Sequence, residues 1–145
     1  MIAKITSLIA LIIAIAGLYI LIKYQLLFSW HPVTIAMQAL AVALMIWARI
    51  TFGRRSFHGA ANTTEGKLVT NGPYKYWRHP IYAAIIYFIW GSVVAYPYAL
   101  TIAVAGTITI ALLSRAFLEE YFLFRAYPEY EEYAKRTKRI IPFVV

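Results

Sequence analysis

An arginine and a glutamate, Arg115 and Glu119, stand four residues apart in a stretch that is rich in helix-forming residues. Residues at this spacing share one face of a helix, so both side chains can meet the same bound molecule. A guanidinium can hold a carboxylate through two parallel hydrogen bonds. The simpler alternative is an ordinary interfacial ion pair, which contributes about 0.3–0.5 kcal/mol. Glu120 lies about 100° around the helix from Glu119, and the sequence leaves its role open.

Polar and aromatic side chains also gather in residues 68–82, a segment between two apolar runs. His79 in this segment could act as a base, as a metal ligand or as a hydrogen-bonding wall of a pocket. A metal site is disfavoured, because the chain has no cysteine and neither His31 nor His58 stands at a ligand spacing from His79. The role of His58 stays open.

Two tyrosines of the same segment are placed by turn chemistry. Tyr74 follows a Gly-Pro pair, and Tyr82 comes two residues after Pro80. The face of an aromatic ring attracts a nearby cation by about 0.5–2 kcal/mol. Tyrosines and a glutamate beside the backbone of a turn therefore suit a small cationic cofactor that carries ribose hydroxyls.

The elements that must position these side chains are apolar. Hydrophobic residues make up 62% of the 145 residues and charged residues only 14%, against about 25% charged in an ordinary soluble domain. We therefore predict one integral membrane domain of the all-α class, comprising residues 1–145. Aspartate is absent, so any carboxylate chemistry falls to the six glutamates.

Four apolar runs predict four transmembrane helices. The first run, between Lys4 and Lys23, has the length of a span, and no small-residue cleavage site follows it, which disfavours a signal peptide. Gln38 lies inside the second run and must find a hydrogen-bonding partner within the bundle. The predicted spans are residues 5–22, 33–52, 80–96 and 98–114.

The fourth helix is expected to continue past Ser114, because no glycine or proline interrupts the chain before Pro128. As one helix from Leu100 to Ala126 it would be about 40 Å long. A hydrocarbon core is about 30 Å thick, so its last turns would emerge into headgroups and water. Residues 129–139 predict a charged helical tail, and residues 140–145 are expected to return to the membrane surface.

The basic residues predict the orientation in the membrane. Twelve of the fourteen lysines and arginines lie in residues 49–78 and 115–139, which flank apolar runs. The positive-inside rule places both segments, and with them the N- and C-termini, in the cytoplasm. The net charge of +8 then indicates contact with anionic membrane lipids rather than with nucleic acid. The polar loop and the tail thus meet on one face of the membrane.

Residues 68–142 carry a series of short motifs, which are Leu68-Val69-Thr70, Gly72-Pro73-Tyr74, Arg78-His79-Pro80 with Tyr82, Glu119-Glu120 with Leu123, Tyr127-Pro128, Tyr130, Tyr133, and Arg139 with Ile141-Pro142. In this order the motifs resemble those of the isoprenylcysteine carboxyl methyltransferase family, whose members are integral membrane enzymes that use S-adenosylmethionine. The chain departs from the family at Ala84, where glycine is common, and at Tyr127-Pro128, where Phe-Gly is common.

The resemblance implies S-adenosylmethionine as the cofactor, bound between residues 66–82 and residues 115–142. It assigns Arg115 to the carboxylate of the substrate, the same residue that its spacing from Glu119 had singled out. The residues that the resemblance assigns to the cofactor are Lys67, Leu68, Val69, Tyr74, His79, Pro80, Ile81, Tyr82 and Glu119.

The implied reaction is transfer of a methyl group to a carboxylate of a lipophilic acceptor drawn from the bilayer. A carboxylate is already ionised at neutral pH, so the reaction needs positioning and desolvation rather than a general base. Other functions stay open: a methyltransferase that acts on a lipid amine or another small acceptor, an intramembrane reductase, or a non-catalytic scaffold. The reductase is disfavoured because the chain has no glycine-rich phosphate-binding motif.

Overall fold

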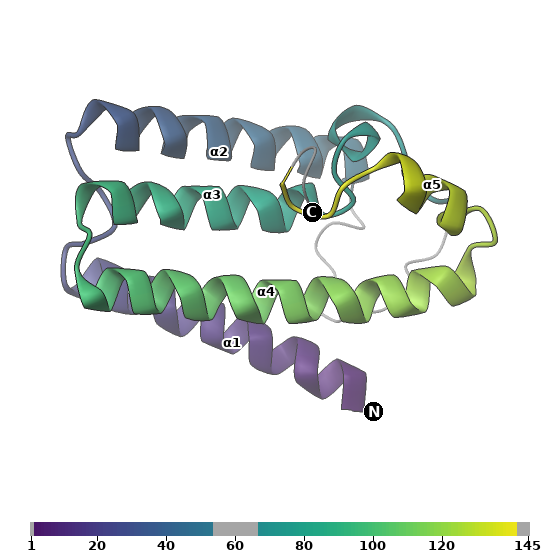
Figure 1. Cartoon of the computed structure of the whole chain (residues 1–145), viewed down its shortest axis with the longest axis horizontal. Helices are drawn as coiled ribbons and strands as arrows, with labels where there is room; N and C mark the ends of the chain where they lie inside the picture. Colours follow the sequence, from purple (N-terminus) through teal and green to yellow (C-terminus); the bar gives the residue numbers. More distant parts are fainter. Residues whose placement is uncertain (1, 54–66, 142–145) are drawn as a thin grey trace.

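The computed structural model describes residues 2–53 and 67–141, and its regular elements are helices (Figure 1). Within these ranges the only β pairing is an isolated bridge between Trp77 and Lys138. The all-α prediction is therefore confirmed. The elements are α1 (Ile2–Lys23), α2 (Pro32–Phe52), the 3₁₀ helix η2 (Gly72–Lys75), α3 (Pro80–Ala95), α4 (Ala99–Ala126) and α5 (Tyr130–Arg136).

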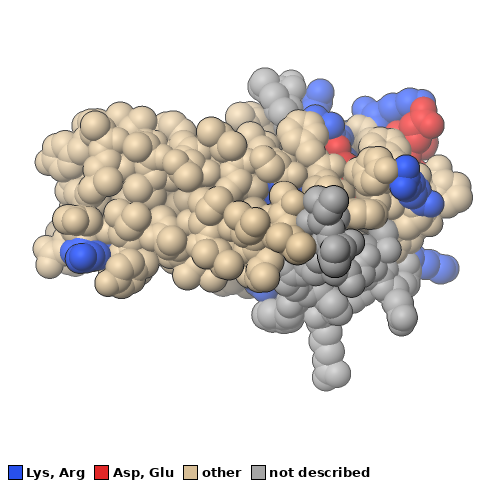
Figure 2. All heavy atoms as spheres, turned by 90° about the horizontal axis from the view of Figure 1, so that it is seen from below, with Lys and Arg blue, Asp and Glu red and all other residues tan. Residues whose placement is uncertain are grey.

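The four long helices run side by side. α2 lies along α3, α1 lies along α4, and α3 faces α4 in the middle of the molecule (Figure 1). The N-terminus, η2 and α5 lie at the same end of the bundle. Charged side chains gather at that end, whereas most of the remaining surface in view carries neither acidic nor basic groups (Figure 2). Residues 67–78 and the C-terminal segment up to Ile141 thus lie at one end of the bundle.

Three helices are long and apolar enough to cross a membrane, namely α1, α2 and α4. α3 is apolar but has only 16 residues, about 24 Å of helix against a hydrocarbon core of about 30 Å. α4 has 28 residues without a break, about 42 Å. The prediction that the fourth helix continues to Ala126 is therefore confirmed, and α4 extends well past the start of α3.

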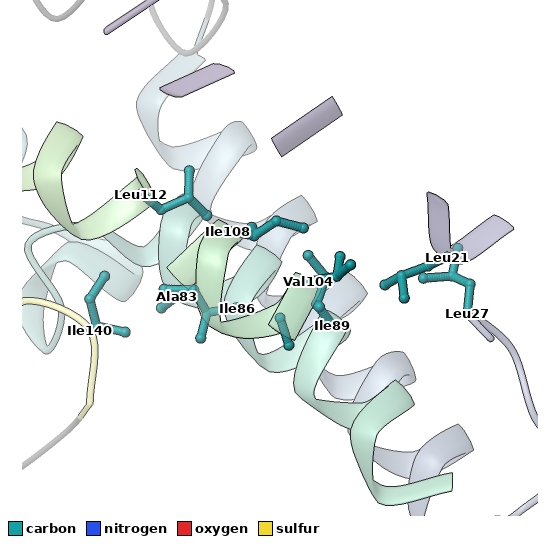
Figure 3. Close-up of a cluster of buried hydrophobic side chains, with 10 residues drawn as sticks. Leu21, Leu27, Ala83, Ile86, Ile89, Val104, Ile108, Leu112 and Ile140 are labelled. Carbon is teal, nitrogen blue, oxygen red and sulfur yellow. The ribbon is translucent and has the colours of Figure 1, made fainter. Parts of the chain in front are cut away.

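The buried core lies where α3 and α4 face each other (Figure 3). Ala83, Ile86 and Ile89 of α3 meet side chains from α4, and Leu21 closes the core from α1. Ile140 of the C-terminal tail also belongs to this core and is only 4% exposed. The prediction that the tail returns to the membrane surface is thus wrong at Ile140, because its side chain fills the end of the core. The α4 members of the core are Val104, Ala105, Ile108 and Leu112.

Gln38 finds the partners that its position in an apolar helix demands. Its side-chain amide donates to the Leu27 carbonyl at 2.7 Å and to Ser92 Oγ at 3.3 Å. Ser92 in turn donates to the same carbonyl at 2.8 Å. The three groups link α2, α3 and the α1–α2 connection. Such a satisfied network avoids the cost of leaving a polar group bare in an apolar setting.

Prolines and one glycine set the ends of the elements that matter for the site. Pro80 occupies the first turn of α3, where its missing N–H is harmless. The Gly72-Pro73 pair that precedes Tyr74 forms the start of η2, and Gly72 has a φ of +56°. A Cβ at Gly72 would also lie 2.5 Å from Thr51 Oγ1, so both backbone conformation and space require glycine.

The predicted helical tail is shorter than expected. α5 ends at Arg136, and Thr137 is extended. Beyond it the backbone hydrogen-bonds to the segment before α3: Arg78 N–H donates to the Lys138 carbonyl at 2.6 Å, and Lys138 N–H donates to the Tyr76 carbonyl at 3.0 Å. These tertiary hydrogen bonds replace the helical ones, so the tail runs across the start of α3 as an extended strap, defined here as residues 137–141.

Candidate functional site

The start of α3 and the second half of α4 bring the predicted site residues together. Pro80 begins α3, which puts His79 at its N-cap and Tyr82 in its first turn. Arg115, Glu119 and Glu120 lie on α4, on the side that faces them. The predicted joining of the two segments is therefore present, although they are more than thirty residues apart in the chain.

Tyr82 joins the arginine to the glutamate. Arg115 Nε donates to Tyr82 Oη at 2.6 Å, and Tyr82 Oη donates to Glu119 Oε1 at 2.5 Å. Arg115 Nε also lies 3.3 Å from Glu119 Oε1, as expected for residues one turn apart. We call Tyr82, Arg115 and Glu119 the Glu119 cluster. Both of these Arg115 contacts use Nε, so neither engages the donors on the two Nη atoms.

His79 lies between two carboxylates. Its ring stacks on Tyr82, with the planes 9° apart and the centroids 5.6 Å apart. Nδ1 lies 3.6 Å from Glu119 Oε2, and Nε2 lies 3.3 Å from Glu120 Oε1. His79 is buried. It therefore fits the predicted role of a hydrogen-bonding wall residue.

The two carboxylates favour the protonated form of His79 by raising its pKa. Burial by itself lowers the pKa of His79, because it disfavours the charged ring. Hydrogen bonds to Glu119 and Glu120, together with their negative charges, outweigh burial and raise the pKa above 6.5. The imidazolium is thus stabilised between the two glutamates.

Glu120 anchors a second group of charges. Arg78 Nε donates to Glu120 Oε1 at 2.8 Å, and Arg139 Nε donates to Glu120 Oε2 at 2.9 Å. The side chains of Glu120 and Arg78 are 5% and 9% exposed, so water screens this pair poorly. We call Arg78, Glu120 and Arg139 the Glu120 cluster. His79 connects it to the Glu119 cluster.

The Glu120 cluster holds the C-terminal strap against α4. Arg78 also donates through Nη1 to the carbonyl of Ala134 at 2.8 Å and to that of Thr137. Arg139, on the strap itself, reaches back to Glu120. The backbone N–H of His79 donates to the Arg139 carbonyl at 3.2 Å. Three segments distant in sequence are thus fixed around one carboxylate.

Tyr74, on η2, is buried. Its carbonyl accepts a hydrogen bond from Tyr133 Oη at 2.7 Å, and its ring packs on Phe52 with centroids 5.3 Å apart. Burial raises the pKa values of both tyrosines, so their hydroxyls stay protonated. α5 is thereby tied to η2.

The remaining predicted cofactor residues flank these clusters. Pro80 is buried and Ile81 is half-buried at the start of α3. Leu68 and Val69 are half-buried and Lys67 is exposed, all just before η2. Leu68 and Val69 take no part in the hydrogen bonds described above for the two clusters. His58, whose role the sequence left open, lies outside the described residues.

Sequence reasoning left Arg78 and Arg139 without a role and Glu120 undecided. Their neighbours in the chain carried the signal, because Arg78 precedes His79 and Glu120 follows Glu119. In the folded protein Arg78 and Arg139 both form ion pairs with Glu120. No helical or strand periodicity predicts these contacts.

Exposure separates the two glutamates. The side chain of Glu119 is 21% exposed, whereas that of Glu120 is 5% exposed. Arg115 beside Glu119 is 7% exposed. Glu119 is therefore the carboxylate of the two that an incoming molecule can reach, and Glu120 is occupied by arginines.

Within residues 2–53 and 67–141, no group of three or more potential ligand side chains is arranged to hold a metal ion.

Two curated bacterial proteins are similar to the chain. One is the nickel-cobalt-cadmium resistance protein NccN of Alcaligenes xylosoxydans xylosoxydans, 31% identical over 119 residues. The other is the cobalt-zinc-cadmium resistance protein CzcN of Cupriavidus metallidurans, 33% identical over 117 residues. Each alignment covers 79% of this chain, and 54% and 52% of the two proteins. The chain thus spans about half the length of these relatives.

The family model described as phospholipid methyltransferase matches residues 29–130, well over half of the chain. The match includes η2, α3, α4 and both glutamates of the site. No solved structure matches the chain. The resemblance noted from the motifs is confirmed at the level of the family, since this family includes the isoprenylcysteine-type membrane methyltransferases. The chain belongs to the phospholipid methyltransferase family.

Proposed function

We propose that the protein transfers a methyl group from S-adenosylmethionine to a carboxylate of a lipophilic acceptor. One observation carries the proposal: Tyr82 joins Arg115 to Glu119 where α4 passes the start of α3. The arrangement puts a reachable carboxylate and a guanidinium side by side at the polar end of an apolar bundle. A hydrophilic cofactor and a lipid-borne acceptor can both reach such a place.

The residues present fit the proposed cofactor. Glu119 can accept hydrogen bonds from ribose hydroxyls, and its side chain is 21% exposed. The stacked rings of His79 and Tyr82 offer aromatic surface beside that carboxylate, and an aromatic face attracts a cation. When bound, S-adenosylmethionine would supply a methyl group on a positively charged sulfur. Lys67, Leu68, Val69, Tyr74, Pro80 and Ile81 complete the proposed binding residues.

Arg115 is the residue that we propose to bind the carboxylate of the acceptor. Its Nε is held by Tyr82 and Glu119, which orients the planar guanidinium. A guanidinium whose plane is fixed can present Nη donors to an acceptor carboxylate. The acceptor is already an anion at neutral pH, so this chain has only to hold it in line and keep water away.

A lipid amine is the second candidate acceptor, and the description of the family as phospholipid methyltransferase favours it. Arg115 argues against it, since a guanidinium repels an ammonium group.

We also propose four membrane spans, α1 to α4, with both termini and the polar end in the cytoplasm. α3 is short for a span, so the bilayer would have to thin or the flanking residues reach outward. The twelve basic residues within residues 49–78 and 115–139 of the sequence support this orientation. Reporter fusions at either terminus would test it: a periplasmic reporter active at the C-terminus would contradict the orientation.

Calorimetric titration of the purified protein with S-adenosylmethionine tests the cofactor. We expect saturable binding, and we expect Glu119→Ala to weaken it about 10–100-fold, the effect of losing a hydrogen bond to a charged group. Glu131→Ala, on an exposed side chain of α5, is the matched control and should bind normally. Absence of heat and of a thermal shift with both the cofactor and its demethylated product would rule out the methyltransferase.

A further inference from the structure

One face of α4 remains apolar and exposed beyond the point where charged residues begin. Ile110, Phe117, Tyr121 and Phe124 are 48–67% exposed. At about 100° per residue these four positions fall within about 60° of one another around the helix. They form a single stripe, which we call the α4 stripe. It begins in the uncharged part of the helix and ends one turn short of Tyr127.

The α4 stripe lies nearly opposite the Glu119 cluster on the same helical turns. Arg115 and Glu119 are about 140° and 180° from Ile110 around the axis, at about 100° per residue. The charged end of α4 is therefore two-sided, with ionic contacts toward α3 and aromatic rings toward the outside. A helix end that emerged fully into water would have no physical reason to keep large aromatic rings exposed on one side.

Arginines lie over two of these rings. The guanidinium carbon of Arg125 is 4.2 Å from the centroid of the Tyr121 ring, and that of Arg139 is 4.3 Å from the Phe117 ring. A guanidinium stacked on an aromatic face keeps its N–H donors at the edge, where they can bind an anion. Aromatic rings beside cationic donors are the pattern of a membrane interface.

We infer that the last turns of the α4 stripe, from Phe117 to Phe124, together with Arg125 and Arg139, bind the headgroups of anionic phospholipids. The stripe continues the outward-facing surface of a helix long and apolar enough to cross the membrane, so lipid covers its first part and is the nearest occupant for the rest. Arg125 and Arg139 match the charge of a phosphate. The inference depends on membrane insertion and not on methyl transfer.

This placement has a consequence for the site. Because Phe117 and Tyr121 flank Glu119 along the helix, lipid headgroups on one face of α4 set the Glu119 cluster at headgroup depth on the other. The reacting group of a lipid-borne acceptor lies at that depth. Anionic lipid would thus fix the level of the site relative to the bilayer.

Spin labelling tests the depth directly, because the chain has no native cysteine. Tyr121→Cys and, separately, Phe117→Cys would carry a nitroxide in vesicles of phosphatidylcholine with phosphatidylglycerol. We expect both labels to show a higher ratio of collisions with oxygen to collisions with a water-soluble nickel chelate than a label in bulk water does. Lys135→Cys, on an exposed α5 side chain, is the control and should show the low ratio of a label in water. Labels at Phe117 and Tyr121 as accessible to the chelate as the Lys135 label would overturn the inference.

The preference of the protein for anionic over zwitterionic lipid tests the role of Arg125. Association of spin-labelled phosphatidylglycerol, relative to phosphatidylcholine, should fall up to about fivefold in Arg125→Gln, the effect of one basic residue near an anionic surface. Arg136→Gln, which alters an exposed arginine of α5, should leave the ratio unchanged. Equal ratios of phosphatidylglycerol to phosphatidylcholine association in the wild type and in Arg125→Gln would overturn the inference. Dipolar coupling between labels at position 121 of two copies would also overturn it, because a second copy of the protein would then cover the α4 stripe.

Discussion

Tyr82 donates a hydrogen bond of 2.5 Å to Glu119, a residue 37 positions later in the chain. The same phenol oxygen accepts from Arg115 Nε at 2.6 Å. One hydroxyl thus orients both the carboxylate proposed for the cofactor and the guanidinium proposed for the acceptor. Substitutions around this hydroxyl should therefore separate binding from turnover.

Removing only the hydroxyl, in Tyr82→Phe, keeps the ring that stacks on His79. We expect binding of S-adenosylmethionine to weaken about tenfold, because Glu119 loses the donor that orients it. Calorimetric titration measures this change. Tyr76→Phe alters an exposed tyrosine and should bind as the wild type does. Unchanged binding in Tyr82→Phe would mean that the phenol has no part in orienting Glu119.

Arg115→Ala should spare the cofactor and lose turnover. Glu119 keeps its hydrogen bond from Tyr82, and the direct contact from Arg115 is long at 3.3 Å. We expect cofactor affinity to change less than about fivefold and turnover to fall at least about 100-fold, the cost of misplacing a reactant.

Arg115→Lys keeps the charge without the planar fork and should recover only part of the activity. Methyl transfer from labelled S-adenosylmethionine to a lipid extract measures turnover for both variants. If Arg115→Ala lost cofactor binding and turnover to the same extent, Arg115 would belong to the cofactor.

Glu120→Gln should strongly destabilise the folded protein. The substitution leaves Arg78 buried without its carboxylate, and breaking a buried pair costs about 3–5 kcal/mol. Thermal unfolding in detergent should show a clear drop in Tm. Glu132→Gln removes the exposed pair with Arg136 and should leave Tm almost unchanged, since exposed pairs contribute little. Equal shifts in the two variants would show that the Glu120 cluster does not hold the strap.

Stability should fall as the pH rises above 6.5. The pKa of His79 is raised above its ordinary 6.5 in the folded protein by Glu119 and Glu120. A raised folded pKa means that the native state binds the proton more tightly than the unfolded chain does. The stabilisation is thus complete below pH 6.5 and is lost as the pH rises through the folded value.

Unfolding temperatures measured from pH 5.5 to pH 9 check this dependence. His79→Gln cannot take up the proton, so its Tm should vary less over the same interval. A wild-type Tm that rises between pH 6.5 and pH 9, or an equal slope in His79→Gln, would contradict the assignment to His79.

The elements were predictable from the sequence, since each depends on local patterns. Uncharged runs between lysines and arginines predicted the apolar helices, and the lack of glycine or proline before Pro128 predicted the length of α4. The demand of Gln38 for partners was also predictable, because an amide in an apolar helix is costly if bare. Ile140 was misplaced, because a hydrophobic residue after a charged tail fits a membrane surface and a core equally well.

By itself, the sequence determined the residue types available for chemistry, the apolar helices and the spacing that puts Arg115 and Glu119 on one face. Only the tertiary structure decided which of two adjacent glutamates stays within reach. Glu120 is enclosed because Arg78 precedes α3 and Arg139 lies on the strap, and both reach it. Glu119 stays partly exposed. The physical reason is that helical periodicity governs contacts three or four residues apart, whereas the contacts that close around Glu120 join residues 19 and 42 positions away.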